Sequence, residues 1–130
     1  IPIVSQCYLV GDDRKFCSAL ITLDMSVILR DYIGIDVNEI PKDPVKQNEL
    51  IILNNKKLSD FTDNEDIFNF VSDEIEKLNQ KFSNPEQIKK FSILPRDFSI
   101  DEGELTPTLK IRRKQINDNW SEVISAMYSE

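Results

Sequence analysis

The fold of this chain is decided near its start, where residues 7–22 read CYLVGDDRKFCSALIT. Both ends of this stretch are apolar, and residues 11–15 between them are polar. Apolar runs separated by a short polar segment are typical of two antiparallel strands joined by a turn. We therefore expect a β-hairpin to open the domain, with Arg14 and Lys15 in its turn.

The composition is that of an ordinary soluble domain. The chain has 130 residues, about one domain, of which 40% are hydrophobic and 30% are charged. No apolar run approaches the ~20 residues that a transmembrane helix needs. Because the chain starts at Ile1, without a Met or a signal-peptide pattern, we interpret it as a piece of a longer protein.

Charge and the lack of histidine argue against several functions. A net charge of -7 opposes general attraction to nucleic acid or to anionic lipid. The chain has no histidine, which excludes Ser-His and Cys-His nucleophile systems within it and argues against a zinc site. Cys7 and Cys17 lie in apolar runs without a metal-ligand spacing, and we expect both to be buried thiols in a reducing compartment.

Capping residues predict a first helix after the hairpin. Asp24 can cap its start, the helix should run to about Ile33, and Gly34 is a good residue to close it. The side chains expected to face the core in this helix are Val27, Ile28 and Tyr32.

The sequence signal weakens over residues 35–62. Pro41, Pro44 and scattered charges interrupt this segment, although residues 45–53 have the character of a short helix. We interpret residues 35–62 as a surface insertion and assign no chemistry to it.

Periodicity returns in the second half of the chain. An amphipathic helix of about five turns, capped by Asp63 or Asn64, is indicated by Ile67, Val71, Ile75, Leu78 and Phe82. Residues 88–94 favour a third strand, and a final helix is marked by Ile116, Trp120, Val123, Ile124 and Met127. These elements predict an α+β fold, in which a small sheet of about three strands packs against helices, with Trp120 in the core.

The most distinctive motif is GELTPTLKIRRK at residues 103–114. Gly103 permits backbone angles that other residues avoid, and Pro107 fixes its own φ. The hydroxyls of Thr106 and Thr108 can satisfy loop amides. We therefore expect a shaped loop that presents Lys110 to a phosphate, at or just before a helix start. Taken alone, four cations in five residues also fit a solvated face.

Other charged residues near the motif have a simpler interpretation. Four acids, Asp97, Asp101, Glu102 and Glu104, are expected to lie exposed on a loop, where nothing would raise the pKa of one of them for acid/base work. Lys89 and Lys90 are interpreted as exposed strand lysines, with contact to a nucleotide or another domain as the alternative.

Three sequence blocks together carry a resemblance to a known family. They are VGDDRKFCSALI at residues 10–21, EQIKKF at 86–91 and GELTPTLKIRR at 103–113. In order and spacing they resemble the C-terminal domain of the long-chain acyl-CoA synthetases (long-chain fatty acid-CoA ligases), within the AMP-forming adenylate ligase superfamily. The resemblance covers most of the chain, so it implies that residues 1–130 form the C-terminal lid domain of such a ligase.

The resemblance implies a two-step reaction shared with a larger N-terminal adenylation domain, which this chain lacks. That domain would bind ATP, Mg and a long-chain fatty acid, form acyl-AMP, and then pass the acyl group to coenzyme A (CoA). Lys110 occupies the place of the family's catalytic lid lysine, and Arg112, Arg113 and Lys114 are candidate contacts to CoA phosphates. The isolated chain is expected to be inactive and to hold no cofactor or metal.

Two other functions stay open at this point. The chain could be a non-catalytic interaction module on the same fold, in which Lys110 is dispensable. Alternatively, the cations at 110–114 could form a phosphate or nucleic-acid patch, although the net charge and the lack of interleaved aromatic residues weaken that interpretation. For the parent ligase we expect a cytoplasmic location, with peripheral attachment to a membrane face as a possibility.

Overall fold

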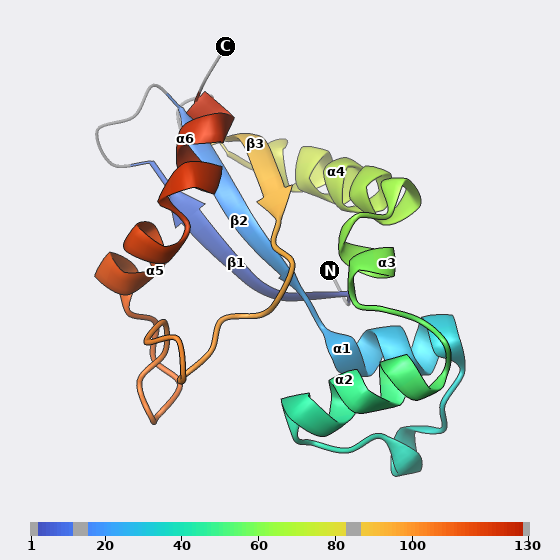
Figure 1. The fold of residues 1–130 in the computed structure, drawn as a ribbon. Coiled ribbons are helices and arrows are strands. Elements are labelled where there is room, and N and C mark those ends of the chain that lie inside the picture. The colour runs from blue at the N-terminus through green and yellow to red at the C-terminus, as the bar shows by residue number, and fades with distance from the viewer. Residues whose placement is uncertain (1–2, 12–15, 83–86, 129–130) are drawn as a thin grey trace.

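The computed structural model describes residues 3–11, 16–82 and 87–128. Its centre is a sheet of three strands in the order β1-β2-β3 (Figure 1). These strands are β1 (Val4–Val10), β2 (Cys17–Leu23) and β3 (Ile88–Ile93).

The opening hairpin and the third strand are confirmed. β1 pairs antiparallel with β2, and β3 pairs parallel with the other edge of β2. Arg14 and Lys15, which we expected in the turn, lie outside the described residues, as does Glu86. The α+β fold class predicted from the sequence is therefore confirmed, with one parallel pairing that no local pattern indicates.

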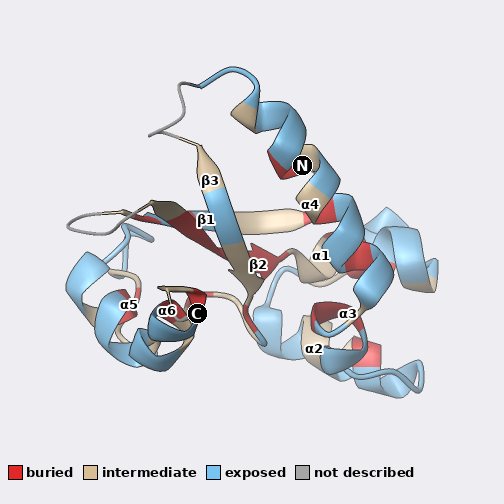
Figure 2. Cartoon of the chain, turned by 90° about the horizontal axis from the view of Figure 1, so that it is seen from above, coloured by how far each residue is buried: buried red, intermediate tan, exposed pale blue. Residues whose placement is uncertain are grey.

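Helices cover both faces of the sheet, because its central strand is apolar on both sides. Ala19 and Ile21 point into a larger hydrophobic cluster, whereas Leu20 between them points into a second, smaller cluster. Successive strand residues face opposite sides of a sheet, so a strand with this pattern is stable only between two layers. Figure 2 shows the buried residues concentrated on the central strand and on the inner faces of the helices.

The larger cluster lies under the first four helices. They are α1 (Met25–Val27), which continues into a π-helical turn (Ile28–Ile33), α2 (Pro44–Leu53), α3 (Ser59–Thr62) and α4 (Glu65–Asn79), with a short 3-10 helix (Val37–Glu39) before α2. The smaller cluster lies under α5 (Arg113–Asn119) and α6 (Ser121–Tyr128) on the opposite face (Figure 1).

The first predicted helix forms between the expected residues. The Asp24 carboxylate accepts the Ser26 amide at 2.9 Å, and Gly34 ends the helix with a φ of 91°. Tyr32 does not face the core as expected, because its side chain is 51% exposed and contacts Phe61 only edge-on, with ring centroids 6.0 Å apart. The π-helical turn changes the angular spacing of its residues, which moves Tyr32 off the inner face.

The second predicted helix is shorter than expected. Its cap is Asn64, whose side chain accepts the Ile67 amide at 3.1 Å. The helix α4 ends at Asn79, and Leu78 and Phe82 are exposed, so their predicted place in the core is wrong. At the end of α4, the side-chain amide of Asn79 binds the backbone of Ile88 at the start of β3. It accepts from the Ile88 N–H at 2.9 Å and donates to the Ile88 C=O at 2.8 Å.

Part of the segment 35–62 belongs to the core. Ile51 of α2 is fully buried in the larger cluster, and Phe61 of α3 joins it. Residues 45–53 are helical as expected. The segment is thus not confined to the surface, while its status as an insertion relative to other proteins stays a prediction.

The predicted burial of both cysteines is wrong for Cys7, which is exposed, and Cys17 is half-buried. Cys7 and Leu9 alternate with the buried Tyr8 and Val10 along β1. They therefore face the side of this edge strand that the helices leave open.

The final predicted helix is present as two helices. α5 and α6 are separated at Trp120, which ends α5. Ile116, Ile124 and Met127 are buried as expected, and Trp120 and Val123 pack against the same cluster.

Candidate active site

The motif at residues 103–114 forms a tight hairpin loop between β3 and α5. Leu105 and Ile111 form an isolated antiparallel bridge at its base. Above the bridge, the Thr106 amide donates to the Lys110 C=O at 2.8 Å, and the Lys110 amide donates to Thr106 Oγ1 at 3.0 Å. Thr106 therefore holds the backbone of Lys110 from both its main chain and its side chain.

The tip of this loop is a proline turn followed by a left-handed residue. The Leu109 amide donates to the Thr106 C=O at 2.7 Å, which places Pro107 at the second position of the turn, where its fixed φ is favoured. The hydroxyls of Thr106 and Thr108 lie 3.1 Å apart. Leu109 has a φ of 66°, so the loop follows the known three-residue hairpin pattern but has leucine where glycine is usual.

Gly103 lies at the entrance to the loop in a conformation that suits glycine. Its φ is 76°, and a Cβ built on it would lie 3.2 Å from Gln115 Cγ of α5. A side chain here would strain the backbone and press on α5. The backbone therefore enters the loop close against the helix that follows it.

Lys110 is exposed at the end of this ordered loop. It lies just before α5, whose N-cap residue is Arg112. Within the part of the chain that the structure describes, no hydrogen bond or ion pair engages its ammonium group. The loop thus combines a fixed backbone with a free cation, a combination suited to stabilising an anion that arrives from outside the domain.

Of the other three cations of the motif, Arg113 is engaged by β1. Arg113 Nη2 donates to the Leu9 C=O at 3.1 Å, and its guanidinium lies 4.7 Å from the centre of the Tyr8 ring. The Arg113 side chain is therefore bound to β1. Arg112 and Lys114 are exposed.

A small hollow lies beside Arg113, between β1 and the last two helices. It measures about 190 Å³ and is lined by Val10, Gly11, Arg113, Asn117, Ser121, Ile124 and Ser125. The Tyr8 hydroxyl donates to Asn117 Oδ1 at 2.9 Å and so fixes one polar wall. The hollow offers one cation, two serine hydroxyls and one side-chain amide.

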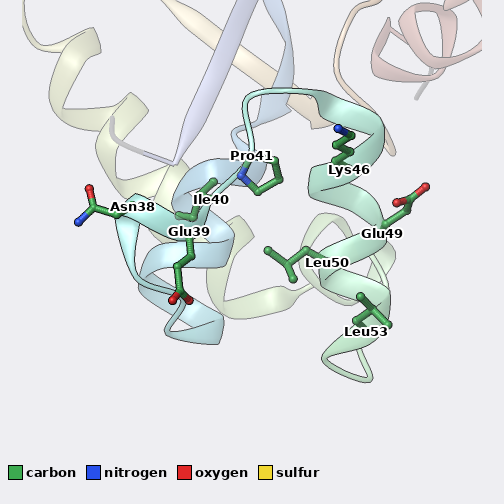
Figure 3. Close-up of a pocket in the computed structure, with 8 residues that line it drawn as sticks. All are labelled: Asn38, Glu39, Ile40, Pro41, Lys46, Glu49, Leu50 and Leu53. Atoms are coloured by element: carbon green, nitrogen blue, oxygen red, sulfur yellow. The ribbon is translucent and has the colours of Figure 1, made fainter.

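A larger depression of about 420 Å³ is far from the motif. It lies between the 3-10 helix and α2 and is lined by Asn38, Glu39, Ile40, Pro41, Lys46, Glu49, Leu50 and Leu53 (Figure 3). Figure 1 shows the loop before α5 below that helix on the left of the molecule, and α2 to the right of it. None of the residues singled out for chemistry in the sequence lines it, so its size does not make it the site.

Sequence reasoning missed Glu104, which is not an exposed loop acid but the most buried charged residue of this region. Its side chain is 0% exposed. It accepts from Arg96 Nη1 and Nη2 at 2.7 and 3.0 Å, from the Ser99 amide at 3.1 Å, from Asn119 Nδ2 at 3.1 Å and from Trp120 Nε1 at 2.7 Å. No local pattern around Glu104 indicates these partners, because they lie between 5 and 16 residues away along the chain.

The electrostatics of Glu104 favour a carboxylate that is ionised near neutral pH. Burial by itself raises the pKa of its carboxyl, but the hydrogen bonds from Arg96, Asn119 and the Ser99 amide together hold that pKa below its ordinary value. A carboxylate in this state cannot serve as a proton donor near neutral pH. The prediction of no acid/base pair is thus unchanged, although the predicted exposure of Glu104 is wrong. It is also wrong for Asp97, which is half-buried and accepts from Ser5 Oγ at 2.6 Å.

Trp120, Lys89 and Lys90 all contact side chains within the domain. The Arg96 guanidinium lies 4.9 Å from the centre of the Trp120 ring, which is half-buried. Lys89 Nζ lies 3.1 Å from Gln87 Oε1, and Lys90 Nζ lies 5.8 Å from the centre of the Phe16 ring. Both lysines are exposed on β3.

Nothing in the described residues gathers three or more carboxylate, thiol or imidazole groups where a metal ion could bind.

Comparison with known proteins identifies the family of this chain. Residues 45–130 match the family model for the AMP-binding enzyme C-terminal domain, and the chain belongs to this family. Its relatives are long-chain-fatty-acid–CoA ligases, as the resemblance in the sequence predicted. The chain is 32% identical over 135 residues to Long-chain-fatty-acid–CoA ligase FadD15 of Mycobacterium tuberculosis, with 99% of this chain and 19% of that protein covered. It is 29% identical to Long-chain-fatty-acid–CoA ligase ACSBG1 of Rattus norvegicus, with 100% of this chain and 18% of that protein covered.

Solved structures support the fold alone. The adenylation domain of a carboxylate reductase from Mycobacterium chelonae superposes with a TM-score of 0.59 at 16% identity, over 99% of this chain and 16% of that chain. The A-PCP didomain of the carboxylic acid reductase from Segniliparus rugosus, in complex with AMP, gives a TM-score of 0.59 at 19% identity, over 98% and 14%. The chain spans about a fifth of the length of the curated relatives it matches.

Proposed function

We propose that this chain is the C-terminal lid of a long-chain fatty acid-CoA ligase and that Lys110 is its catalytic residue. The parent enzyme would convert ATP, a long-chain fatty acid and CoA to acyl-CoA, AMP and pyrophosphate through acyl-AMP. The observation that carries this proposal is the free, exposed ammonium of Lys110 on a loop whose backbone is fixed by Thr106, within a domain of the AMP-binding enzyme family.

The role of Lys110 follows from the charges of the first step. A fatty-acid carboxylate oxygen attacks the α-phosphorus of ATP, a new O–P bond forms, and the bond to pyrophosphate breaks. Two anions approach each other, and negative charge develops on the oxygens of the phosphorus. An ammonium held in place beside them stabilises this charge without accepting or donating a proton. Lys110 therefore acts electrostatically, and Gly103, Thr106, Pro107 and Thr108 shape its loop.

The rest of the site belongs to a partner domain. An N-terminal adenylation domain of the same polypeptide would bind ATP, Mg and the fatty acid, so the isolated chain is expected to be inactive. For the second step the lid would rotate, as mobile domains of enzymes do, so that another face meets CoA. Arg112 and Lys114 are exposed and suited to its phosphates, while Arg113 would have to give up its contacts to β1 or bind from the small hollow.

The place of the parent enzyme in the cell is part of this proposal. No helix in the described residues is both long enough and apolar enough to cross a bilayer. Long-chain acyl substrates and products partition into membranes. We propose a cytoplasmic enzyme that works at a membrane face, without an anchor in these residues.

The test separates the two half-reactions in the full-length ligase. Lys110→Ala should lower acyl-AMP formation from ATP and fatty acid by about a hundredfold or more, because a positioned charge of this kind contributes about 10²–10³ to the rate. Thioester formation from supplied acyl-AMP should persist. Lys77→Ala, which removes an exposed lysine of α4, is the matched control and should leave both rates unchanged. If both half-reactions survive Lys110→Ala, the non-catalytic interaction module becomes the better description.

A further inference from the structure

The buried Glu104 carboxylate lies at the base of the Lys110 loop. Its main chain spans that base, since the Arg112 amide donates to the Glu104 C=O at 2.8 Å and the Glu104 amide donates to the Ser99 C=O at 3.1 Å. The residue that follows it, Leu105, makes the bridge that closes the loop. Any movement of Glu104 is therefore transmitted to both arms of the loop.

The side chain of Glu104 joins the connection between β3 and α5 to the end of α5. Arg96 and Ser99 belong to the connection after β3, and Asn119 and Trp120 lie at the end of α5. The Arg96 contact is bidentate, a geometry that fixes both distance and orientation. Five hydrogen bonds on one carboxylate leave its two oxygens little room to move.

This network is more specific than core packing requires. Taking a carboxylate out of water is costly, and a buried ion pair is often no more stabilising than apolar residues of the same volume. The neighbouring cluster around Ile116 and Phe98 is apolar and could have been continued by leucine here. The polar network instead fixes the position and orientation of the groups that it joins, because hydrogen bonds are directional and apolar contacts are not.

We infer that Glu104 is a positioning residue for Lys110: its carboxylate, held by Arg96, Asn119 and Trp120, fixes the base of the loop so that the ammonium at its end reaches one defined point. This inference rests on the proposed function of Lys110. Glu104 touches neither substrate nor reacting atoms, and it acts only through the loop.

The test is Glu104→Gln in the full-length ligase, which keeps the size of the side chain and removes its charge. We expect kcat for acyl-AMP formation to fall about tenfold to a hundredfold, because a misplacement of ~1 Å at a reacting group can cost about 10²-fold. KM for ATP and for the fatty acid should not change. Glu102→Gln, which removes an exposed carboxylate from the same loop, is the matched control and should keep the wild-type rate.

The decisive measurement is the double variant. If Glu104 acts through Lys110, Glu104→Gln should slow the Lys110→Ala enzyme no further. A loss of the same factor in both backgrounds would overturn the inference while leaving the role of Lys110 intact. If Lys110→Ala itself forms acyl-AMP at the wild-type rate, the proposed function fails, and the inference fails with it.

A milder variant covers the case in which Glu104→Gln does not fold. Trp120→Phe removes the Nε1–H donor and keeps an aromatic ring in the smaller cluster. It should lower kcat severalfold, again only when Lys110 is present, and it should speed hydrogen exchange at the Lys110 amide, which is bonded to Thr106 Oγ1. Unchanged exchange and unchanged kcat in a folded Trp120→Phe enzyme would overturn the inference.

Discussion

The two faces of the sheet are organised by different kinds of interaction. On the face under α1 to α4, apolar side chains such as Ile28 and Val71 meet in one large cluster. On the face under α5 and α6, a smaller apolar cluster borders the polar network of Glu104. The comparison indicates that one face mainly supplies stability, while the other, with its directional bonds, holds the loop that carries Lys110.

The largest expected effect on stability comes from the apolar face. Ile51→Ala should lower the free energy of unfolding by about 2–5 kcal/mol, because Ile51 is 0% exposed and its truncation leaves a cavity. Its neighbour Ile52 is 57% exposed, so Ile52→Ala is the matched control and should change stability little. Chemical unfolding of both variants checks this. Equal effects would mean that α2 does not belong to the core.

The polar face should show the next largest effect. Arg96→Met should lower the free energy of unfolding by about 2–3 kcal/mol, since it leaves the Glu104 carboxylate buried without its cation. The side chain of Arg96 is 35% exposed, so the loss should be below the roughly 3–5 kcal/mol typical of fully buried pairs. Chemical unfolding measures it, with Arg30→Met, from an exposed ion pair with Asp31, as the control expected to be near neutral.

Acid should weaken the polar face selectively. Because the folded-state pKa of Glu104 is lowered below its ordinary value of 4.5, its contribution to stability is fully present above about that pH and is lost as pH falls through the folded pKa. Unfolding measured from pH 6 to pH 3 should therefore show a smaller loss in Glu104→Gln than in the wild-type chain. Identical pH profiles would mean that the carboxylate is not held in its ionised form.

The smallest expected effect lies at the tip of the Lys110 loop. Leu109→Gly should change the free energy of unfolding by less than about 1 kcal/mol, because relief of the left-handed leucine is offset by the larger entropy of glycine in the unfolded chain. The variant should nevertheless lower the rate of acyl-AMP formation, since the loop loses rigidity. A stability change without any change in that rate would show that the shape of the tip is not used.

Local signals predicted much of the fold. Asp24 and Gly34 delimit a helix because a cap and a left-handed glycine are properties of adjacent residues. Asn64 worked in the same way. The predicted burial of Leu78 was wrong because α4 ends at the next residue, where the Asn79 side chain binds β3. Nothing in the helical period indicates that contact.

The candidate site also has one part that local sequence signals predicted and one part that they did not. The loop around Lys110 could be predicted because its turn residues are contiguous, with Pro107 and two threonines in one short stretch. The role of Glu104 could not be predicted, because its partners Arg96 and Trp120 lie 8 and 16 residues away and no local pattern shows that the fold brings them together. An acid beside a loop motif is usually solvated, and only the folded chain distinguishes this one.

The hairpin closed by Thr106 also has a thermodynamic consequence for domain closure. The backbone of this hairpin is already ordered within the chain itself, so binding of a ligand to Lys110 would not have to order it. Ordering one backbone residue opposes association by about 1–2 kcal/mol. Under the proposed function, a lid that arrives with this loop already folded would lose rigid-body freedom and the freedom of the Lys110 side chain, but little backbone freedom. The same loop could then leave intact before the second step.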